Sequence, residues 1–450
     1  MAGAGAGRAA PGIVTGSPLG RPVTSTRMRR LRLAVVVVTA IAAVLALKSF
    51  VVDPLTGHFG GPFEDFQAYL GAARSMAGGG SPYARFNAST VVMSGFDYPP
   101  FAALMVRPLG LLGDRAAMVV WLWLTLACAV AGGVVTARTA LPRSWPATEL
   151  GVLAALAFAP SSYNFWHGQI NPIVFLLLAI AFSAYVRGRQ VTVGVLLGFA
   201  AAVKIAPVAF LVLLLRRRWW RGSAAMVVTG LATSAIALVT VGVGPLLTFV
   251  TRVLPDLDRA TGWIFNQSIG GAISRLADQS VLRVQPTSAL VQVAGVIAAA
   301  FVLWLAGWAT RPTPRLREER AVEFAMGTTA MLLASGIAWY PHFTYLLIPL
   351  FAVTGLAAAR GWRAERRLVA AAAAALIAFG LVAPVALAGL TLQGVTAVSR
   401  TAAWWPFLQL CSLPCVCATW LGAVLVWRLR HDPVPATPPD QAGPRAAATG

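Results

Sequence analysis

Charged side chains are scarce in this chain: they make up 11% of its 450 residues, and only 15 residues are acidic. Hydrophobic residues make up 58%, and the mean hydropathy is +0.73. Apolar runs long enough to cross ~30 Å of hydrocarbon recur along most of the sequence. These runs are continuous rather than alternating, which predicts helices and not a β-barrel. The composition therefore excludes a water-soluble class and predicts an all-α integral membrane protein with several spans.

Lysine is nearly absent, because Lys48 and Lys204 are the only lysines, so the formal net charge of +21 comes from arginine. Such an excess would suggest nucleic acid in a soluble protein. Here the arginines cluster in short tracts between apolar runs, which is the positive-inside pattern of membrane proteins. We therefore expect membrane lipid and no nucleic acid among its partners, and a multi-pass protein of the cell membrane.

Cysteine is also rare, and all four cysteines lie in apolar runs where they act as small hydrophobic residues. No cysteine has the spacing to histidine that a metal site requires, and none forms an outer pair suited to a disulfide. The sequence thus gives no reason to expect a metal ion or a cofactor. The four are Cys128, Cys411, Cys415 and Cys417.

The basic tracts set the predicted organisation. Residues 1–32 and 431–450 are polar and rich in Gly, Ala or Pro, so we expect two disordered cytoplasmic tails. Residues 33–430 are expected to form one membrane domain of roughly ten to twelve helices. Two polar stretches predict extracytoplasmic loops, a large first loop at 53–100 and a second at 251–287.

The apolar run at 191–215 has basic residues on both flanks. A single span would place Arg187 and Arg216 on opposite sides of the membrane, against the positive-inside rule. Pro207 favours two short helices that meet near Lys204. We therefore expect a helical hairpin here, with one full span as the alternative.

An acidic pair, Glu64 and Asp65, follows the first long apolar run. Either carboxylate could act as a general base on a hydroxyl or remain a solvated loop charge. Aromatic neighbours such as Phe66 would hold the loop at the membrane surface. A further carboxylate, Asp97, either belongs to the same outer group of polar residues or caps the turn before Pro99, and the cap is favoured.

Lys204 lies inside an apolar run, where a charged lysine costs about 2.5 to 3.5 kcal/mol at the bilayer centre. It either extends toward the membrane surface or meets an anionic partner, for which a phosphate is the natural candidate. His342 lies between two apolar runs and is either an interfacial histidine bonded to backbone or a group that contacts phosphate or moves a proton.

Further polar residues fall on the predicted outer side. The amides suit sugar hydroxyls, although they could equally join helices by hydrogen bonds. A carboxylate base with cations and amides around an outer cavity fits glycosyl transfer from a lipid phosphate, because the weakly basic leaving group needs charge stabilisation more than a proton. The candidates are Tyr83, Tyr98, His167, Gln169, Asn171, Asn266, Gln267 and Arg275.

Several short motifs follow one another over residues 60–350, in an order like that of a known family. In chain order, the motifs are an acidic residue after the first helix, Gly-x-x-Pro-Tyr (Gly79 to Tyr83), Tyr-Pro-Pro (Tyr98 to Pro100), Gly-Gln-x-Asn (Gly168 to Asn171), Lys-x-x-Pro (Lys204 to Pro207), Arg-Arg-Trp (Arg217 to Trp219), Asn-Gln-Ser (Asn266 to Ser268) and a late histidine. The series resembles the actinobacterial polyprenol-phosphate-mannose-dependent α-1,2-mannosyltransferases, GT-C-fold enzymes of glycosyltransferase family 87.

The resemblance implies a polyprenyl-phosphate-mannose donor, a glycolipid or lipoglycan acceptor such as a phosphatidylinositol mannoside, lipomannan or lipoarabinomannan, an extracytoplasmic site and inversion at the anomeric carbon. It implies that Asp65 is the catalytic base, with Glu64 as the adjacent candidate. The family often has Trp-x-His-His late in the chain, whereas this sequence has Trp339-Tyr340-Pro341-His342.

Two other functions are compatible with the sequence. A branch of the same family transfers arabinofuranose from decaprenyl-phosphate-arabinose. A lipid-linked sugar transporter is a different class, but long outer loops with few inner ones favour an enzyme, because a transporter needs polar access from both faces. A purely structural subunit would have little reason to keep Lys204 in an apolar run.

Overall fold

The structure is a computed structural model that describes residues 25–56, 63–86, 95–257, 261–278, 288–312, 315–383 and 404–431. Residues 1–24 and 432–450, which make up most of the two predicted tails, lie outside the described residues. Parts of both predicted outer loops, at 57–62, 87–94, 258–260 and 279–287, also lie outside them.

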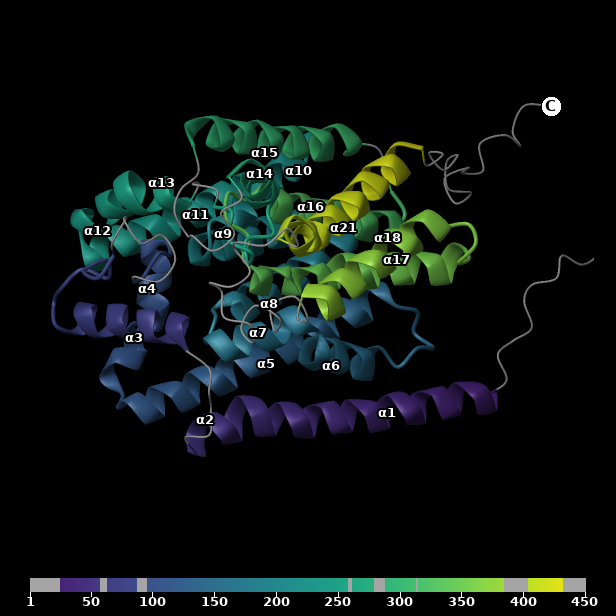
Figure 1. Ribbon diagram of the computed structural model, residues 1–450, viewed down its shortest axis with the longest axis horizontal. Coiled ribbons are helices and arrows are strands. Elements are labelled where there is room, and N and C mark those ends of the chain that lie inside the picture. The colour runs from purple at the N-terminus through teal and green to yellow at the C-terminus, as the bar shows by residue number, and fades with distance from the viewer. Residues whose placement is uncertain are drawn as a thin grey trace, which may run out of the picture.

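Helices of very different lengths build the protein (Figure 1). The first part contains α1 (Ser25–Leu47), η1 (Lys48–Val52), α2 (Asp53–Thr56), α3 (Glu64–Ala77), α4 (Pro100–Val106), η2 (Arg107–Leu111), α5 (Asp114–Ala140), α6 (Ala147–Ala157), α7 (Ala159–His167) and α8 (Asn171–Val186). The middle part contains α9 (Gln190–Val203), η3 (Ala206–Ala209), α10 (Phe210–Arg216), α11 (Trp220–Val241), α12 (Val243–Thr248), η4 (Phe249–Val253), α13 (Leu254–Leu257), α14 (Ile269–Asp278) and α15 (Ala289–Ala309). The last part contains α16 (Arg317–Ala334), η5 (Tyr340–Leu346), α17 (Leu347–Arg360), α18 (Arg366–Ile377), η6 (Ala378–Val382) and α21 (Trp404–His431).

The chain is an all-α membrane protein, as the composition predicted. Among the described residues, an isolated bridge between Asn266 and Trp339 is the one piece of extended pairing. Five of the described helices are long and apolar enough to cross a membrane, and several shorter apolar helices accompany them. The prediction of roughly ten to twelve spans in a GT-C-type arrangement stays a prediction.

The first predicted outer loop contains regular structure. Helix α3 lies within it, so Asp65 stands in the first turn of a helix and not in an irregular loop. The placement agrees with electrostatics, because acidic side chains are stabilised at a helix N-terminus. Helix α1 also begins at Ser25, so residues 25–32, expected in the tail, are helical.

The predicted hairpin near Lys204 is confirmed. Helix α9 ends at Val203, the position whose carbonyl the ring of Pro207 would meet in a continuous helix. Helices α9 and α11 run parallel, since a Cβ on Gly194 would lie 2.0 Å from the Gly222 carbonyl oxygen and one on Gly198 would lie 2.7 Å from Thr229. Two consecutive parallel helices require α10 to bring the chain back, so both basic flanks lie at one end of the bundle.

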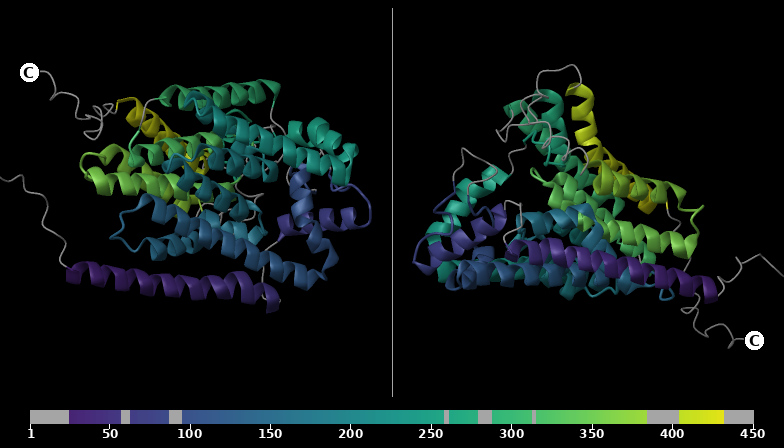
Figure 2. Two further views of the ribbon diagram at one scale, coloured as in Figure 1. Left: turned by 180° about the vertical axis from the view of Figure 1, so that it is seen from behind. Right: turned by 60° about the horizontal axis from the view of Figure 1, so that its bottom comes forward.

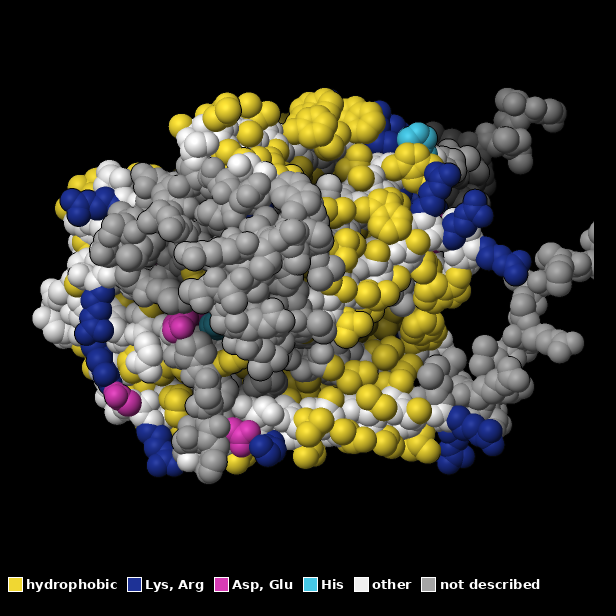
Figure 3. Space-filling view, viewed as in Figure 1, with side chains coloured by type: hydrophobic (Ala, Val, Ile, Leu, Met, Phe, Trp, Pro, Cys, Tyr) yellow, Lys and Arg dark blue, Asp and Glu magenta, His cyan; other side chains and the backbone are white. Residues whose placement is uncertain are grey.

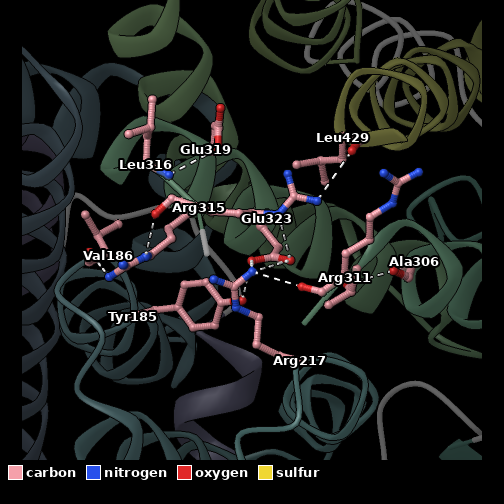
Figure 4. Close-up of polar contacts among 12 residues, drawn as sticks. Tyr185, Val186, Arg217, Ala306, Arg311, Arg315, Leu316, Glu319, Glu323 and Leu429 are labelled. Atoms are coloured by element: carbon pink, nitrogen blue, oxygen red, sulfur yellow. Dashed lines mark hydrogen bonds and ion pairs between the residues drawn. The ribbon is translucent and has the colours of Figure 1, made fainter. Parts of the chain in front are cut away.

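Buried ion pairs fasten that end, which we call the basic end (Figure 4). Glu323 on α16 is fully buried and lies 3.1 Å from Arg217 after α10 and 3.4 Å from Arg315. The hydroxyl of Tyr185 on α8 donates to the same carboxylate at 2.7 Å. Three separate parts of the chain therefore meet at one carboxylate.

The opposite end carries α3, α4, α12 and α13, which gather at the left of Figure 1, while α1 lies along one edge of the bundle in Figure 1 and in the left view of Figure 2. Gly168, which ends α7, packs closely against α3. Its φ of +67° favours glycine, and a Cβ there would lie 2.6 Å from the Cβ of Phe66. This close approach sets the residue after Gly168 beside the start of α3, where the candidate site forms.

Candidate active site

A cavity of about 550 Å³ opens at the end of the bundle away from the basic end. Five of the sequence-predicted site residues line it, although they come from α3, the α7–α8 turn, the α9 break, η5 and the segment before α4. They are Asp65, Tyr98, Gln169, Lys204 and His342. The structure thus brings together polar residues that are spread over most of the chain.

Asp65 is held by one side chain. The Gln169 amide nitrogen donates to Asp65 Oδ2 at 2.6 Å, which leaves the other carboxylate oxygen available to a ligand in the cavity. The amide oxygen of Gln169 accepts hydrogen bonds from the Tyr98 hydroxyl at 3.2 Å and from the Asn171 amide at 3.3 Å. Because the oxygen is fixed by two donors, the nitrogen of Gln169 is oriented toward Asp65.

The environment makes Asp65 a weaker acid than usual. Loss of solvent is the largest cause that raises the pKa of Asp65 to about 7; the negative charge of Asp97 raises it as well, and the Lys204 ammonium lowers it. A general base works best when its pKa lies near the working pH, since it must be ionised and still attract a proton. Asp65 meets that condition near neutral pH.

Lys204 occupies the break between α9 and η3, and its ammonium is held from two sides. It donates to Asn171 Oδ1 at 2.8 Å, and Nζ lies 2.7 Å from His342 Nε2. Nζ also stands 5.3 Å from the centre of the Tyr98 ring. Lys204 therefore does not extend to the membrane surface but points into the cavity. A lysine in an apolar run requires such a cavity or an anionic partner.

A shell of buried hydroxyls and amides supports these residues. Asn171 is fully buried and receives a hydrogen bond from the Tyr345 hydroxyl at 3.0 Å, while its own amide donates to Asn164 Oδ1 at 2.8 Å. The Tyr69 hydroxyl donates to the Tyr98 hydroxyl at 2.9 Å. Tyr69, which was not among the predicted site residues, lies four residues after Asp65 and hence on the same helix face.

Asp97 is a second carboxylate of the cavity, although the sequence favoured a turn cap for it. Loss of solvent raises the pKa of Asp97 to about 6, and the charge of Lys204 opposes the shift. The cavity therefore holds two carboxylates near one ammonium. The scarcity of acidic residues in the whole chain was the signal that could have identified Asp97.

Glu64 and His167 lie outside the cavity. Glu64 is exposed and lines a separate hollow on the far side of α3, and His167 Nδ1 is 3.9 Å from its carboxylate. Burial lowers the pKa of His167 to about 4, so it is neutral near pH 7. The two residues belong to the outer rim of α3 and α7.

Tyr83 acts behind the cavity and not in it. Its hydroxyl donates to the backbone oxygen of Tyr98 at 2.7 Å, and its ring stacks on Phe249 with centroids 6.4 Å apart. Tyr83 thus fixes the backbone at Tyr98, one residue from Asp97. The Gly-x-x-Pro-Tyr motif supports the cavity wall.

The backbone segment 335–339, next to the cavity, is held in place by a group of three residues. They are Asn266, Gln267 and Arg275. Asn266 Oδ1 accepts from the backbone N–H of Ala338 at 3.0 Å, and the backbone N–H of Gln267 donates to the backbone oxygen of Ala338 at 2.8 Å. The guanidinium of Arg275 is buried and donates to the Asn266 oxygen at 2.6 Å. These contacts place the 335–339 segment, which lines the cavity and ends at Trp339.

The remaining wall of the cavity is apolar and reaches exposed surface. Val208 is 49% exposed and Val250 is 51% exposed, so this side faces the lipid-covered flank of the bundle. A polar wall opposite an apolar wall suits a ligand with a charged head and a long hydrocarbon chain. The apolar lining comprises Ile205, Val208, Val250, Leu254, Leu257, Leu303 and Met331.

Within the described ranges, no group of three or more His, Cys, Asp or Glu side chains could hold a metal ion. The residues on the cavity wall are instead a carboxylate pair, an ammonium, a histidine and an amide. Fold and site together define a membrane-embedded enzyme of the class that uses a lipid-linked substrate.

The chain belongs to glycosyltransferase family 87, whose family model matches residues 96–336, and it is a membrane glycosyltransferase. It is 29% identical to the polyprenol-phosphate-mannose-dependent α-(1-2)-phosphatidylinositol mannoside mannosyltransferase of Mycobacterium tuberculosis strain H37Rv, with 69% of this chain and 71% of that protein covered. The family that the motifs resembled is therefore confirmed.

A second relative is named for a different acceptor. The chain is 30% identical to the α-(1-2)-phosphatidylinositol pentamannoside mannosyltransferase of Mycobacterium tuberculosis strain CDC 1551, with 73% of this chain and 74% of that protein covered. A phosphatidylinositol mannoside mannosyltransferase of Mycolicibacterium smegmatis is 30% identical, with 59% of this chain and 62% of that protein covered. All three are named as enzymes that depend on polyprenol-phosphate-mannose.

Proposed function

We propose that this protein transfers mannose from polyprenyl-phosphate-mannose to a phosphatidylinositol mannoside, forming an α-1,2 linkage with inversion at the anomeric carbon. The observation that carries the proposal is the cavity in which Asp65, fixed by Gln169, faces Lys204 across an opening with an apolar wall. The names of the relatives support mannose as the sugar and the glycolipid as the acceptor.

Asp65 performs the proton transfer in this mechanism. Its carboxylate takes the proton of the acceptor hydroxyl while that oxygen attacks the anomeric carbon of mannose. The bond between this carbon and the phosphate oxygen breaks, and the polyprenyl phosphate leaves with the bonding electrons. Phosphate is a weak base, so one carboxylate suffices and no general acid is needed for the leaving group.

Lys204 binds the phosphate of the donor. An ammonium that is already oriented by Asn171 and His342 gains a charge-assisted hydrogen bond to phosphate without first being ordered. The same bond stabilises the charge that develops on the leaving phosphate. The apolar wall around Val208 and Val250 receives the first units of the polyprenyl chain.

The cavity faces the extracytoplasmic side of the cell membrane in this proposal, because the arginine-rich loops gather at the other end. Cysteines introduced at the exposed positions Gln67 and Arg189, in a background free of the native cysteines, test it. An impermeant thiol reagent should label the Gln67 site in intact cells and leave the Arg189 site unlabelled. The reverse pattern would invert the orientation.

Incubation of the purified protein with two labelled donors tests the proposed reaction. Polyprenyl-phosphate-mannose with a phosphatidylinositol mannoside should give a product one mannose larger, and digestion with a linkage-specific mannosidase should assign the α-1,2 bond. Transfer from decaprenyl-phosphate-arabinose alone would replace mannose by arabinofuranose. A labelled donor that crosses vesicles without any product would favour the transporter.

A further inference from the structure

A second hollow, of about 740 Å³, lies at the basic end where α17, α18 and α21 meet, at the end of the bundle opposite the cavity that contains Asp65. Its lining contains five arginines and one glutamate: Arg360, Arg363, Glu365, Arg366, Arg367 and Arg428. Figure 3 shows dark-blue Lys and Arg side chains along this edge of the molecule, at the right of the view. We propose that this hollow binds the phosphate headgroup of an anionic phospholipid.

The hollow has a rigid frame. Arg428 on α21 donates to both carboxylate oxygens of Glu365, at 2.8 and 2.7 Å, and Glu365 is buried. Arg360 at the end of α17 donates to Glu319 at 2.6 Å. These pairs use two nearby carboxylates and join α21 to the start of α18 and α17 to the start of α16, so the frame is already formed before a ligand binds.

The other three arginines of the hollow have no carboxylate partner among the described residues, so their charges can attract a ligand. Arg363 and Arg366 are exposed, and neither has an ion pair with the part of the chain that the structure describes. The Arg367 guanidinium lies over the Trp427 ring, 4.8 Å from its centre, in a cation–π contact that leaves its N–H groups unoccupied by a carboxylate. Three cations therefore converge without a neutralising partner among the described residues.

The N-terminus of helix α18 adds to the positive electrostatic potential of the hollow. It starts at Arg366, so its first backbone N–H groups have no acceptor within the helix, and the helix dipole favours an anion at this end. The contribution reinforces the arginines and does not replace them. A phosphate group fits both, because it offers several oxygens to guanidinium and amide donors.

The surroundings favour a lipid over a free anion. Trp362 is 48% exposed and Trp427 is 41% exposed, and tryptophan is enriched where protein meets the polar surface of a bilayer. Leu376, Ile377 and Leu381 continue along α18 and η6 with 48%, 55% and 62% exposure. The acyl chains of a lipid bound at the arginines could pack along this apolar surface. This arrangement is expected of a basic headgroup pocket between membrane helices.

Native mass spectrometry of the detergent-purified protein tests this site with phosphatidylglycerol, phosphatidylcholine and inorganic phosphate as probes. We expect phosphatidylglycerol to bind in preference to phosphatidylcholine. In Arg363→Gln/Arg366→Gln its affinity should fall about fivefold for each charge removed, roughly 25-fold in all. Both side chains are exposed, so the variant should remain folded and monodisperse.

The matched control is Arg143→Gln/Arg189→Gln, which removes two exposed arginines from the chain outside the hollow. Its affinity for phosphatidylglycerol should equal that of the unmodified protein. Equal binding of the two phospholipids, or an equal loss in the control, would overturn the proposal by reducing it to unspecific surface charge. Inorganic phosphate that displaces phosphatidylglycerol at equal concentration would overturn the assignment to a lipid.

Discussion

Lys204 and His342 lie 138 residues apart in the sequence, yet Lys204 Nζ and His342 Nε2 are 2.7 Å apart in the cavity. An ammonium group has only donors, so Nε2 of His342 must accept, and the ring is then neutral with its proton on Nδ1. His342 therefore orients Lys204 and does not add a second positive charge. One cation remains to bind the donor phosphate.

Replacement of Lys204 by methionine should weaken donor binding and leave acceptor binding nearly unchanged. A charge-assisted hydrogen bond contributes about 1.5 to 3 kcal/mol, so the apparent KM for the donor should rise roughly 10- to 150-fold. Steady-state kinetics with each substrate varied in turn measure it. Lys48→Met is the matched control, since the only other lysine is exposed and paired with Asp53. An unchanged donor KM in Lys204→Met would remove the phosphate role.

Activity should rise with pH through about 7. The folded protein raises the pKa of Asp65 to about 7, and only the ionised carboxylate accepts a proton, so kcat/KM should fall tenfold for each pH unit below that value. A pH profile of kcat/KM measured between pH 5 and 8 shows this limb. A profile that is flat down to about pH 5 would mean that the base has an ordinary carboxylate pKa.

Asp97→Asn should move that limb toward lower pH. The negative charge of Asp97 is one of the causes that raise the pKa of Asp65, so its removal makes Asp65 easier to ionise. The variant should keep turnover above the limb, because the amide retains the shape of the wall. If Asp97 were itself the base, the variant would lose turnover at every pH.

Glu323→Gln should destabilise the fold without a specific effect on substrate affinity. The substitution leaves Arg217 and Arg315 buried without their charge partner, and breaking a buried pair costs about 3 to 5 kcal/mol. Thermal unfolding in detergent should show a markedly lower Tm, while Glu318→Gln on the same helix should not. Equal Tm values for the two variants would show that the cluster contributes little.

Some of this organisation could be read from the sequence. The hydropathy predicted an all-helical membrane protein, and Pro207 with its flanking arginines predicted the break at Lys204. Asn171 and Gln169 were identified as polar candidates, because they fall on the predicted outer side and their amides suit sugar hydroxyls. These features are local, so spacing and composition report them directly.

Other features depend on contacts between distant segments. Asn266 carries the same amide group as Gln169, but it holds backbone because the 335–339 segment packs against it, and Arg275 in turn holds the backbone oxygen of Asn266. Asp97 looked like a turn cap because its sequence neighbours are prolines. Only the three-dimensional approach of α9 sets Lys204 near it, and no local pattern encodes that approach.

Paired variants in the mannosyl transfer assay test whether Asp65 is the catalytic base. Asp65→Asn should reduce kcat by about 10²- to 10⁴-fold with the protein still folded, because the amide keeps the hydrogen-bonding shape but cannot take the proton. Glu64→Gln, one residue away but outside the cavity, should stay near the unmodified rate. An active Asp65→Asn beside an inactive Glu64→Gln would contradict the account and move the base to Glu64.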